Sequence, residues 1–471
     1  MTIAAPGTGA GKTTVTLGLM AALRGRGLRV QPFKVGPDYL DPAYHWRVCG
    51  RASINLDPWL TSEAFVRETF AYHMRDTDVA VIEGVMGLFD GVGGDAAGYG
   101  STAHVAALVR APVVLVVDAS GSAETAAAVA MGCARYAETM RDAALTPPPG
   151  AGVGVVGVIF NNVGGDAHAA TLRRAITPTD LPVFGCLPRD GAIALPERHL
   201  GLVSVYEHPL TDSQIARMRA WIEAHVDVEA LLRAISEDGA YSRNADVREH
   251  VPPGGNRRLR IGVARDAAFC FYYEDNLRLL GEAGAEFVPF SPLSDAALPS
   301  HLDALYLGGG FPESFADGLA ENRPMLNAIK AFPGAIYAEC GGFMLLCERF
   351  YDRDGVVHRL AGRVPAEIEM TDTLQGFGYR NVRLAEDCVL GAAGDQLRGH
   401  EFHFSRLKQA PANGRWAFTG KRGGDGAEIR FGYSDGRTLA SYMHVHFGQW
   451  SDAARRVVAR MREFSGTRTA K

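Results

Sequence analysis

The chain has 471 residues, of which 47% are apolar, so it is long enough for two globular domains and too long for one ordinary core. Its 48 basic and 53 acidic residues give a net charge of -5 without a basic block, so we expect a small-molecule substrate and no nucleic-acid partner. No apolar run approaches the ~18 residues of a membrane span, and the seven scattered cysteines lack zinc-type spacing, so we expect a cytoplasmic protein without a membrane anchor.

Strand and helix patterns alternate along the first half of the chain. Residues 2–5 predict a short strand that ends in the glycine-rich segment APGTGAGKTT, and residues 13–24 carry apolar side chains at helical spacing. Further continuous apolar strands, each followed by a polar or glycine-rich turn, are expected within 27–36, 78–91, 111–120 and 152–165. Continuous apolar strands are typical of a parallel sheet covered on both faces, so we predict a doubly wound α/β domain.

The glycine-rich loop after the first strand predicts a phosphate site. Glycine lets backbone N–H groups approach phosphate oxygens, Lys12 supplies positive charge, and Thr13 at the helix start can ligate Mg²⁺. Pro6 stands where the strict G-x-x-x-x-G-K-S/T pattern has its first glycine, so the alternative is a turn whose glycines serve geometry alone. The order of strand, loop and amphipathic helix favours a nucleotide site made of Gly9, Gly11, Lys12, Thr13 and Thr14.

Charged residues at two further strand ends extend this predicted site. Glu83 ends the strand VAVIE, where nucleotide hydrolases place a metal-ligating acid, although solvated acids are also common there. KVGPDYLDPAYH lies at the carboxyl end of another strand, where α/β sheets bind ligands; the alternative is that its aspartates only cap local backbone. We expect substrate contacts from Lys34, Asp38, Tyr39, Leu40 and Asp41, and Mg²⁺ ligation by Thr13, Glu83 and Asp41.

A polar segment separates two predicted domains. The alternating pattern fades over 236–258, which contains Pro-Pro-Gly-Gly and is predicted to link an ATP-binding domain, 1–235, to a second domain, 259–471. In the second domain we expect strands within 260–266, 285–292, 303–310 and 334–342. These strands again alternate with helix-like stretches, so this domain is also predicted to be α/β.

Cys340 follows the last of those strands and precedes two glycines and a helix. This arrangement is typical of a nucleophile elbow, in which the helix N-terminus favours the thiolate. A lone cysteine is more often a small buried hydrophobe, so the hypothesis also needs a base and an oxyanion site. SYMHVHF supplies His444 and His446, and we expect at most one of the two to face Cys340. The oxyanion is expected to meet the backbone N–H groups of Gly309, Gly310 and Gly341.

Motifs along nearly the whole chain resemble the a,c-diamide synthases of cobalamin biosynthesis. These motifs are APGTGAGKTT, KVGPDYLDPAYH, NLDPWL, EGVMGLFDG, GSTAHVA, GGGFPE, AECGGFM, GHEFH and SYMHVHF. The resemblance implies an N-terminal P-loop domain similar to dethiobiotin synthetase and a C-terminal class I glutamine amidotransferase domain. It also implies an ATP- and glutamine-dependent amidoligase that uses Mg²⁺ and acts on a corrinoid acid.

The resemblance further implies roles for individual residues. Cys340 matches the glutaminase nucleophile, and His444 matches the histidine that activates it. His446 stands where the class I pattern has glutamate, which implies a dyad instead of a triad. IFNNVGG resembles the family's base-binding region, so Asn161 or Asn162 is expected to contact the adenine.

Several alternatives stay open at this point. A partitioning-type switch ATPase would carry a signature lysine that this chain lacks, and it would lack the second domain. Cobyric acid synthase amidates other side chains of the same ring, but KVGPDYLDP and the compact length favour the a,c enzyme. The motifs GSTAHVA and FKVGPDY favour cobyrinic acid over its cobalt-free counterpart, hydrogenobyrinic acid, as acceptor. The sequence leaves open whether the chain forms a homodimer.

Overall fold

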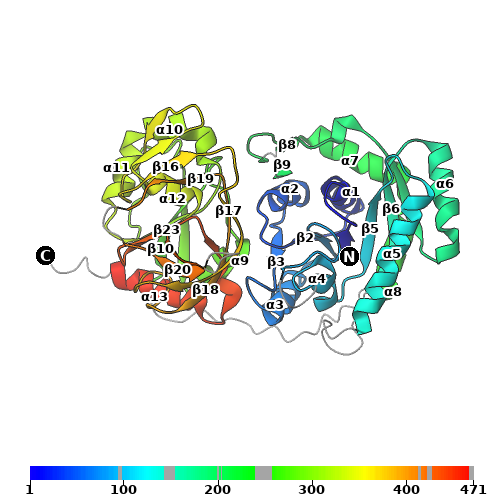
Figure 1. The fold of residues 1–471 in the computed structure, drawn as a ribbon, viewed down its shortest axis with the longest axis horizontal. Helices are drawn as coiled ribbons and strands as arrows, with labels where there is room; N and C mark the ends of the chain where they lie inside the picture. Colours follow the sequence, from blue (N-terminus) through cyan, green and yellow to red (C-terminus); the bar gives the residue numbers. More distant parts are fainter. Residues whose placement is uncertain are drawn as a thin grey trace. The chain divides into compact units, whose positions relative to one another are not determined.

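The computed structural model describes residues 1–93, 98–142, 154–198, 201–202, 204–238, 257–411, 415–421 and 427–465. The chain divides into two compact units, unit 1 (Met1–Arg248) and unit 2 (Glu249–Lys471), drawn from blue to red in Figure 1. Both units are α/β, as the strand and helix patterns predict. Most of the predicted linker 236–258 lies outside the described residues, so its bounds remain a prediction. Among the helices that the structure describes, none is long and apolar enough to cross a membrane.

Unit 1 is built on a parallel sheet. Within the described residues the sheet has seven strands in the order β3-β2-β4-β1-β5-β6-β7. The strands are β1 (Thr2–Ala4), β2 (Val30–Val35), β3 (Ile54–Leu56), β4 (Val79–Glu83), β5 (Val113–Asp118), β6 (Val155–Val163) and β7 (Val183–Pro188). From the central β1 the chain moves outward to β2 and β3, returns through β4, and then builds the other half of the sheet. A small hairpin of β8 (Glu197–Arg198) and β9 (Gly201–Leu202) lies apart from this sheet.

Helices cover both faces of this sheet, which is why its strands are continuously apolar. The bounds are α1 (Lys12–Gly25), α2 (Leu40–Cys49), α3 (Glu63–His73), α4 (Thr102–Leu108), α5 (Glu124–Asp142), α6 (Asp166–Ile176), α7 (Asp212–His225) and α8 (Val228–Asp238). Helices α1, α2, α7 and α8 pack on one face around Leu19 and Ile222, and α3 to α6 pack on the other around Phe70 and Leu172. A capping box between Thr211 and Gln214 fixes the start of α7.

Unit 2 is built on a mainly parallel sheet of six strands among its described residues, in the order β11-β10-β12-β13-β23-β22. Its strands are β10 (Leu259–Ala264), β11 (Ala285–Phe290), β12 (Ala304–Leu307), β13 (Ala335–Glu339), β22 (Tyr433–Ser434) and β23 (Thr438–Ser441). Helices α9 (Glu274–Glu282) and α13 (Ala453–Ser465) cover one face. Helices α10 (Ala316–Glu321), α11 (Arg323–Ala331) and α12 (Gly341–Leu346) cover the other, and Figure 1 shows the two groups on opposite sides of the sheet.

Two smaller sheets flank the unit 2 sheet. One has the order β15-β14-β16-β19, with β14 (Arg349–Tyr351), β15 (Val357–Arg359), β16 (Glu367–Met370) and β19 (Ser405–Gln409). The other has the order β21-β20-β17-β18-β24, with β17 (Gly376–Leu384), β18 (Gln396–His403), β20 (Phe418–Lys421), β21 (Glu428–Phe431) and β24 (His444–Val445). Strand β24 follows the main sheet's β23 after two residues, so this second sheet begins beside the end of the main one.

Candidate active site

In unit 1 the predicted nucleotide and metal residues follow three adjacent strands. Strand β1 leads into the glycine loop, β4 ends at Glu83, and Lys34 lies near the end of β2. The register pairs Lys34 with Glu83 and Glu83 with Ile3, so these strand ends lie side by side. Ligands of open α/β sheets bind at such carboxyl ends, where the chain reverses its direction across the sheet.

The glycine loop has the backbone that a phosphate cradle needs. Gly9 and Gly11 have φ of 83° and 84°, values that other residues rarely adopt. A Cβ on Gly11 would lie 2.3 Å from Nδ2 of Asn161, whose amide donates to the Ala10 carbonyl at 3.0 Å. Lys12 Nζ donates to the Gly7 carbonyl within the loop at 3.0 Å and to the Met86 carbonyl, three residues after β4, at 2.7 Å. Thr14, the second threonine of GKTT, is half-buried on the first turn of α1.

Asn161 therefore supports the glycine loop, a role that could not be predicted from the sequence. Its side chain holds the loop from β6, and a contact with adenine remains a prediction. The neighbouring Asn162 adopts a positive φ of 57° and donates to Asp118 Oδ1 at 2.9 Å on the surface.

A buried cluster of charged side chains surrounds Glu83. Its carboxylate accepts from the Thr13 hydroxyl at 2.6 Å and from Lys34 Nζ at 3.2 Å, and His45 Nε2 lies 2.7 Å away. Lys34 Nζ also contacts Asp41 at 2.5 Å and donates to the Gly84 carbonyl at 3.1 Å. Buried charges are tolerated when they are paired and hydrogen-bonded in this way.

The cluster shifts the protonation of its members. Burial alone would raise the pKa of Glu83, but Lys34, His45 and the Thr13 hydroxyl outweigh it and lower that pKa. Burial likewise opposes the charge on Lys34, yet Asp41, Glu83 and Asp38 raise its pKa. Burial, Asp38 and Glu83 raise the pKa of Asp41 despite the contact with Lys34. The surroundings thus favour the charged forms of the lysine and the glutamate, whereas for the aspartate burial and the neighbouring carboxylates oppose the charge that Lys34 favours.

The predicted substrate loop, KVGPDYLDP, is held in shape by its neighbours. Asn55 donates from its amide to the Gly36 and Asp38 carbonyls, both at 2.8 Å, and Asp38 Oδ1 accepts from the Leu40 N–H at 2.8 Å. Helix α2 starts at Leu40, directly after Tyr39. Asp38 therefore does cap local backbone, which was the alternative to substrate contact, and its second oxygen lies 3.8 Å from Lys34 Nζ.

Sequence reasoning missed several contacts that build this centre. His45 belongs to a recognised motif, but nothing in the motif predicts its bond to Glu83 or its second contact, 2.9 Å from Ser53 Oγ. Thr102 of GSTAHVA exchanges two hydrogen bonds with the backbone of Val85 and so fixes the loop after β4. The motifs KVGPDYLDPAYH and GSTAHVA could have pointed to His45 and Thr102, because each motif places a polar residue at a strand end or helix start.

Unit 2 brings its predicted residues together in the same way. Strands β12, β13 and β23 are neighbours, and they lead respectively into the glycines of GGGFPE, Cys340 and the His444 segment. Cys340 has φ of 46° and ψ of -103°, a strained conformation for a non-glycine residue and the expected geometry of a nucleophile elbow. Its N–H donates to the Ser441 carbonyl at 2.7 Å, which ties the elbow to β23.

The expectation that the helix N-terminus gives Cys340 a thiolate is wrong for this structure. Burial raises the pKa of the thiol, and the nearby Glu313, Glu339 and Glu401 raise it further, whereas the Gly341 N–H alone lowers it. Helix α12 has only six residues, so its dipole is small. The surroundings of Cys340 therefore favour the thiol over the thiolate.

Two glycines of GGGFPE have different roles: Gly309 makes room for His444, and Gly310 is a candidate oxyanion donor. A Cβ on Gly309 would lie 2.6 Å from Cε1 and 3.2 Å from Nε2 of His444, so the imidazole occupies the space that this glycine leaves. The Gly309 N–H donates to the Phe271 carbonyl at 3.3 Å. Gly310 has φ of 154°, and its nitrogen lies 3.2 Å from where a Cβ of Gly341 would be. Gly310 and Gly341 are thus the adjacent pair of candidate oxyanion donors.

The two histidines of SYMHVHF have different surroundings. In a continuous strand, the side chains of residues two apart point to the same face. Strand β24 ends at Val445, so this rule does not fix the direction of the His446 side chain. His444 Nδ1 lies 3.5 Å from Glu339 Oε2. His446 Nδ1 accepts from the Gly448 N–H at 3.0 Å, and its ring packs against Tyr273. This geometry favours His444 as the base and His446 as a structural residue.

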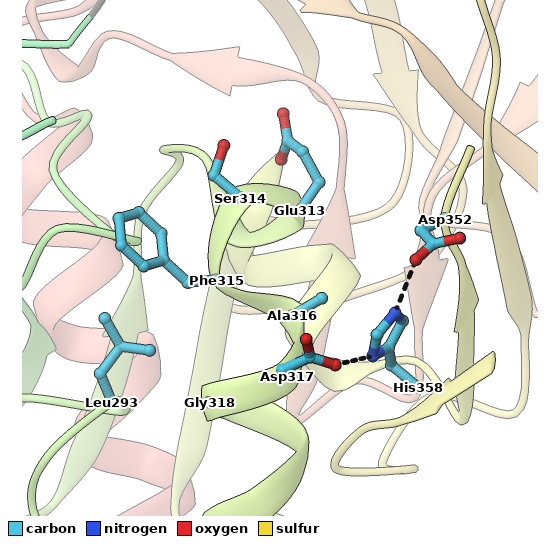
Figure 2. A pocket seen from close by; sticks show the side chains of 9 residues that line it. All are labelled: Leu293, Glu313, Ser314, Phe315, Ala316, Asp317, Gly318, Asp352 and His358. Atoms are coloured by element: carbon cyan, nitrogen blue, oxygen red, sulfur yellow. Dashed lines mark hydrogen bonds and ion pairs between the residues drawn. The ribbon is translucent and has the colours of Figure 1, made fainter. Parts of the chain in front are cut away.

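A cavity of about 300 Å³ lies beside helix α10 in unit 2. Figure 2 shows His358 between Asp317 and Asp352, with ring nitrogens 3.3 and 3.1 Å from their carboxylates. Glu313 of GGGFPE also lines the cavity, but no predicted catalytic residue does. We therefore assign the cavity no part in the reaction.

Comparisons with known proteins agree with this division of the chain. The CobQ/CobB/MinD/ParA nucleotide binding domain matches residues 1–203, and the CobB/CobQ-like glutamine amidotransferase domain matches residues 260–451. A cobyrinate a,c-diamide synthase from Listeria monocytogenes is 43% identical over 453 residues, which are 95% of this chain and 96% of that protein. The chain belongs to the cobyrinate a,c-diamide synthase family.

Other members of the cobyrinate a,c-diamide synthase family match along almost the whole chain. The protein from Syntrophotalea carbinolica is 42% identical over 97% of both chains, and the one from Salmonella typhimurium is 41% identical over 97% of this chain and 98% of its own. The nucleotide-binding domain family on its own also includes MinD and ParA. The glutamine amidotransferase domain and the relatives that match along almost the whole chain assign the protein to the synthase family. The resemblance drawn from the sequence motifs is thereby confirmed.

Proposed function

We propose that this protein amidates the a and c side-chain carboxylates of cobyrinic acid, with ATP for activation and L-glutamine as the source of ammonia. The observation that carries the proposal is the match to synthases over at least 95% of the chain, which includes both the phosphate loop and the Cys340 elbow. Each unit supports one half of such a reaction: unit 1 has a nucleotide-type site, and unit 2 has a glutaminase-type site.

In unit 1 the group to be amidated is a carboxylate, which is a poor electrophile. A carboxylate does not react with ammonia, so the γ-phosphoryl group of ATP is transferred to a carboxylate oxygen, which gives ADP and an acyl phosphate. Ammonia then attacks the acyl carbon, phosphate leaves, and the amide remains. The loop N–H groups and Lys12 would hold the phosphates, and Asn161 would keep the loop in the required shape.

The residues around Thr13 fit a magnesium ion. Thr13 Oγ1 and Glu83 Oε1 lie 2.6 Å apart at the head of α1, and both are hard oxygen donors. Mg²⁺ in nucleotide sites is usually held by one or two protein oxygens together with the substrate phosphates. Bound Mg²⁺ would neutralise phosphate charge. Asp41 was also expected as a ligand, but its contact with Lys34 suits it better to holding that lysine.

The acceptor carboxylate is proposed to bind near KVGPDYLDP. Lys34 provides the positive charge, while Asp38 and Asp41 would repel a carboxylate and instead position the lysine. Tyr39 and Leu40 lie where this loop turns into α2, and we assign them the contacts with the body of the acceptor. The amide of Asn55 keeps this turn in place.

In unit 2 the thiol of Cys340 attacks the glutamine carboxamide carbon, and its proton passes to His444. The N–H groups of Gly310 and Gly341 stabilise the oxyanion, ammonia leaves with the proton from His444, and water hydrolyses the thioester to glutamate. Gly309 serves this step by leaving room for the imidazole.

The test is incubation of the purified protein with ATP, Mg²⁺ and L-glutamine and either cobyrinic or hydrogenobyrinic acid, with chromatographic and mass analysis of the amides. We expect a diamide at a and c with cobyrinic acid as the better acceptor. A better yield with hydrogenobyrinic acid would reverse the choice of acceptor, and amidation at other carboxylates would indicate cobyric acid synthase. ATP hydrolysis that needs neither acceptor nor glutamine would instead support a switch ATPase.

A further inference from the structure

Glu339 is the last residue of β13 and immediately precedes Cys340. Its side chain is fully buried, with 0% exposure, and its carboxylate accepts hydrogen bonds from Tyr306 Oη at 3.0 Å, Tyr337 Oη at 2.5 Å and the Val445 N–H at 3.0 Å. The remaining side of the carboxylate faces His444, whose Nδ1 is 3.5 Å from Oε2. A buried carboxylate therefore lies on the Nδ1 side of the proposed base.

The orientation of the His444 imidazole determines what the contact with Glu339 can do. The Cε1 and Nε2 atoms of His444 face Gly309, two residues after β12, and Nδ1 faces Glu339. A histidine that takes a proton on Nε2 must carry its other proton on Nδ1, and a carboxylate beside Nδ1 selects that tautomer and stabilises the imidazolium. We propose that Glu339 is a positioning residue that orients His444 and stabilises its protonated form during glutamine hydrolysis. This inference rests on the proposed glutaminase roles of Cys340 and His444.

The position that the class I pattern reserves for this carboxylate cannot supply it here. His446 stands at that position, and burial lowers its pKa to about 4, so it is neutral near pH 7. Its Nδ1 is occupied by the Gly448 N–H, and Asn276 holds the backbone on either side through bonds of 2.7 Å to the Val445 carbonyl and the Phe447 N–H. The carboxylate that completes the Cys340–His444 dyad is therefore Glu339, at the end of the strand that leads to the nucleophile.

Other titratable groups that face His444 do not replace Glu339. His400 lies opposite His444 on β18, and burial lowers its pKa to about 3; the pKa of His403 falls to about 4 for the same main reason. Both are uncharged in the range where a glutaminase would be assayed. Glu401 is paired with Arg380 at 2.9 Å, and burial raises its pKa. Glu339 Oε2 lies at ion-pair distance, 3.5 Å, from His444 Nδ1.

The competing explanation is that Glu339 only satisfies the two tyrosine hydroxyls of the core. Glu339→Gln separates the two explanations, because glutamine keeps the volume and an acceptor oxygen but removes the charge. The readout is glutamate release from L-glutamine, measured against pH in the full-length protein. We expect kcat to fall by roughly 10²-fold with KM nearly unchanged. We also expect the acidic limb of the kcat profile to move down by about one pH unit, because the imidazolium loses its counter-charge.

Glu367→Gln is the matched control. Glu367 is a buried carboxylate of the same unit that accepts from Tyr351 Oη at 2.9 Å, and it lies on β16 away from the catalytic residues. The same chemical change there should leave kcat and the pH profile of glutamate release unaltered. Amidation with free ammonia should survive in Glu339→Gln, because unit 1 is untouched.

Three results would overturn the inference: an unchanged kcat, a lower kcat with an unmoved acidic limb, or an equal loss in Glu367→Gln. Should Glu339→Gln fail to fold, Glu339→Asp provides the test, since it keeps the charge but shortens the side chain. It should lower kcat by about tenfold and leave the acidic limb in place, and a limb shifted downward would count against the charge. Failure of the parent protein to amidate a corrinoid would refute the proposed function without deciding this point, because glutamate release is measured alone.

Discussion

Lys34 offers the sharpest test of the buried cluster in unit 1. Its side chain is 4% exposed, and its Nζ lies 2.5 Å from Asp41 and 3.2 Å from Glu83. Lys34→Met keeps most of the side-chain volume but leaves two buried carboxylates without their cation. One lysine–glutamate contact at 3.2 Å corresponds to about 5 kcal/mol at an effective dielectric constant of about 20. Breaking a buried pair by removing one partner costs about 3–5 kcal/mol, so we expect a loss of that size in the free energy of unfolding near pH 7.

The loss should depend on pH with a definite sign. Without Lys34, burial and mutual repulsion raise the pKa of Asp41 and Glu83 in the folded state above their unfolded values. The folded variant then binds more protons than the unfolded one, so its stability is greatest at low pH and falls as pH rises. The slope is at most about 1.4 kcal/mol per pH unit for each proton. In the parent protein the raised pKa of Lys34 keeps this residue's contribution constant through neutral pH.

Urea unfolding followed by tryptophan fluorescence at about pH 6, 7 and 8 measures this effect. The transition of unit 1 is identified in the parent protein as the one that ATP shifts to higher urea. Lys330→Met, an exposed lysine on α11, is the control and should change stability by less than about 0.5 kcal/mol. A Lys34→Met loss below about 1 kcal/mol, or one that does not grow with pH, would refute the charge reasoning.

The other predictions concern the division of labour between the units. Cys340→Ser should abolish glutamine-dependent amidation and spare amidation with free ammonia; equal loss with both donors would contradict the two-site assignment. Lys12→Ala should abolish amidation with either donor, as product chromatography would show, because the phosphates lose their cation. Gly309→Ala should remove glutaminase activity selectively, since its Cβ would lie 2.6 Å from His444, and normal glutamate release would disprove that crowding. Tyr39→Ala should change the ratio of monoamide to diamide over time, and an unchanged ratio would place the acceptor elsewhere.

The fold and the strand-end positions of both centres could be predicted because they depend on local patterns. The apolar strands and the glycine turns place Lys12, Glu83 and Cys340 at carboxyl ends of strands, and parallel sheets bring such ends together. The histidine of unit 2 was assigned through a motif, and the structure places it beside Gly309.

What could not be predicted depends on side chains that meet from distant parts of the chain. The bond between His45 and Glu83 joins residues 38 apart, and Val445 donates to Glu339 across 106 residues. For Cys340 the sequence shows the helix start but not the burial that raises the pKa of its thiol. Such long-range contacts leave no periodic signal in the sequence.

The hydrogen bond from Asn161 to the Ala10 carbonyl spans 151 residues, and it has a consequence for folding. The loop and α1 precede β6 in the chain and are synthesised before it, but the side chain that holds the loop comes from β6. Contacts of such large sequence separation form late, because the intervening chain must first be ordered. A growing polypeptide that ends before β6 therefore carries every residue of the phosphate loop without the side chain that fixes its shape. The phosphate loop is therefore made before β6 but becomes competent to bind a nucleotide only after β6 has joined the sheet.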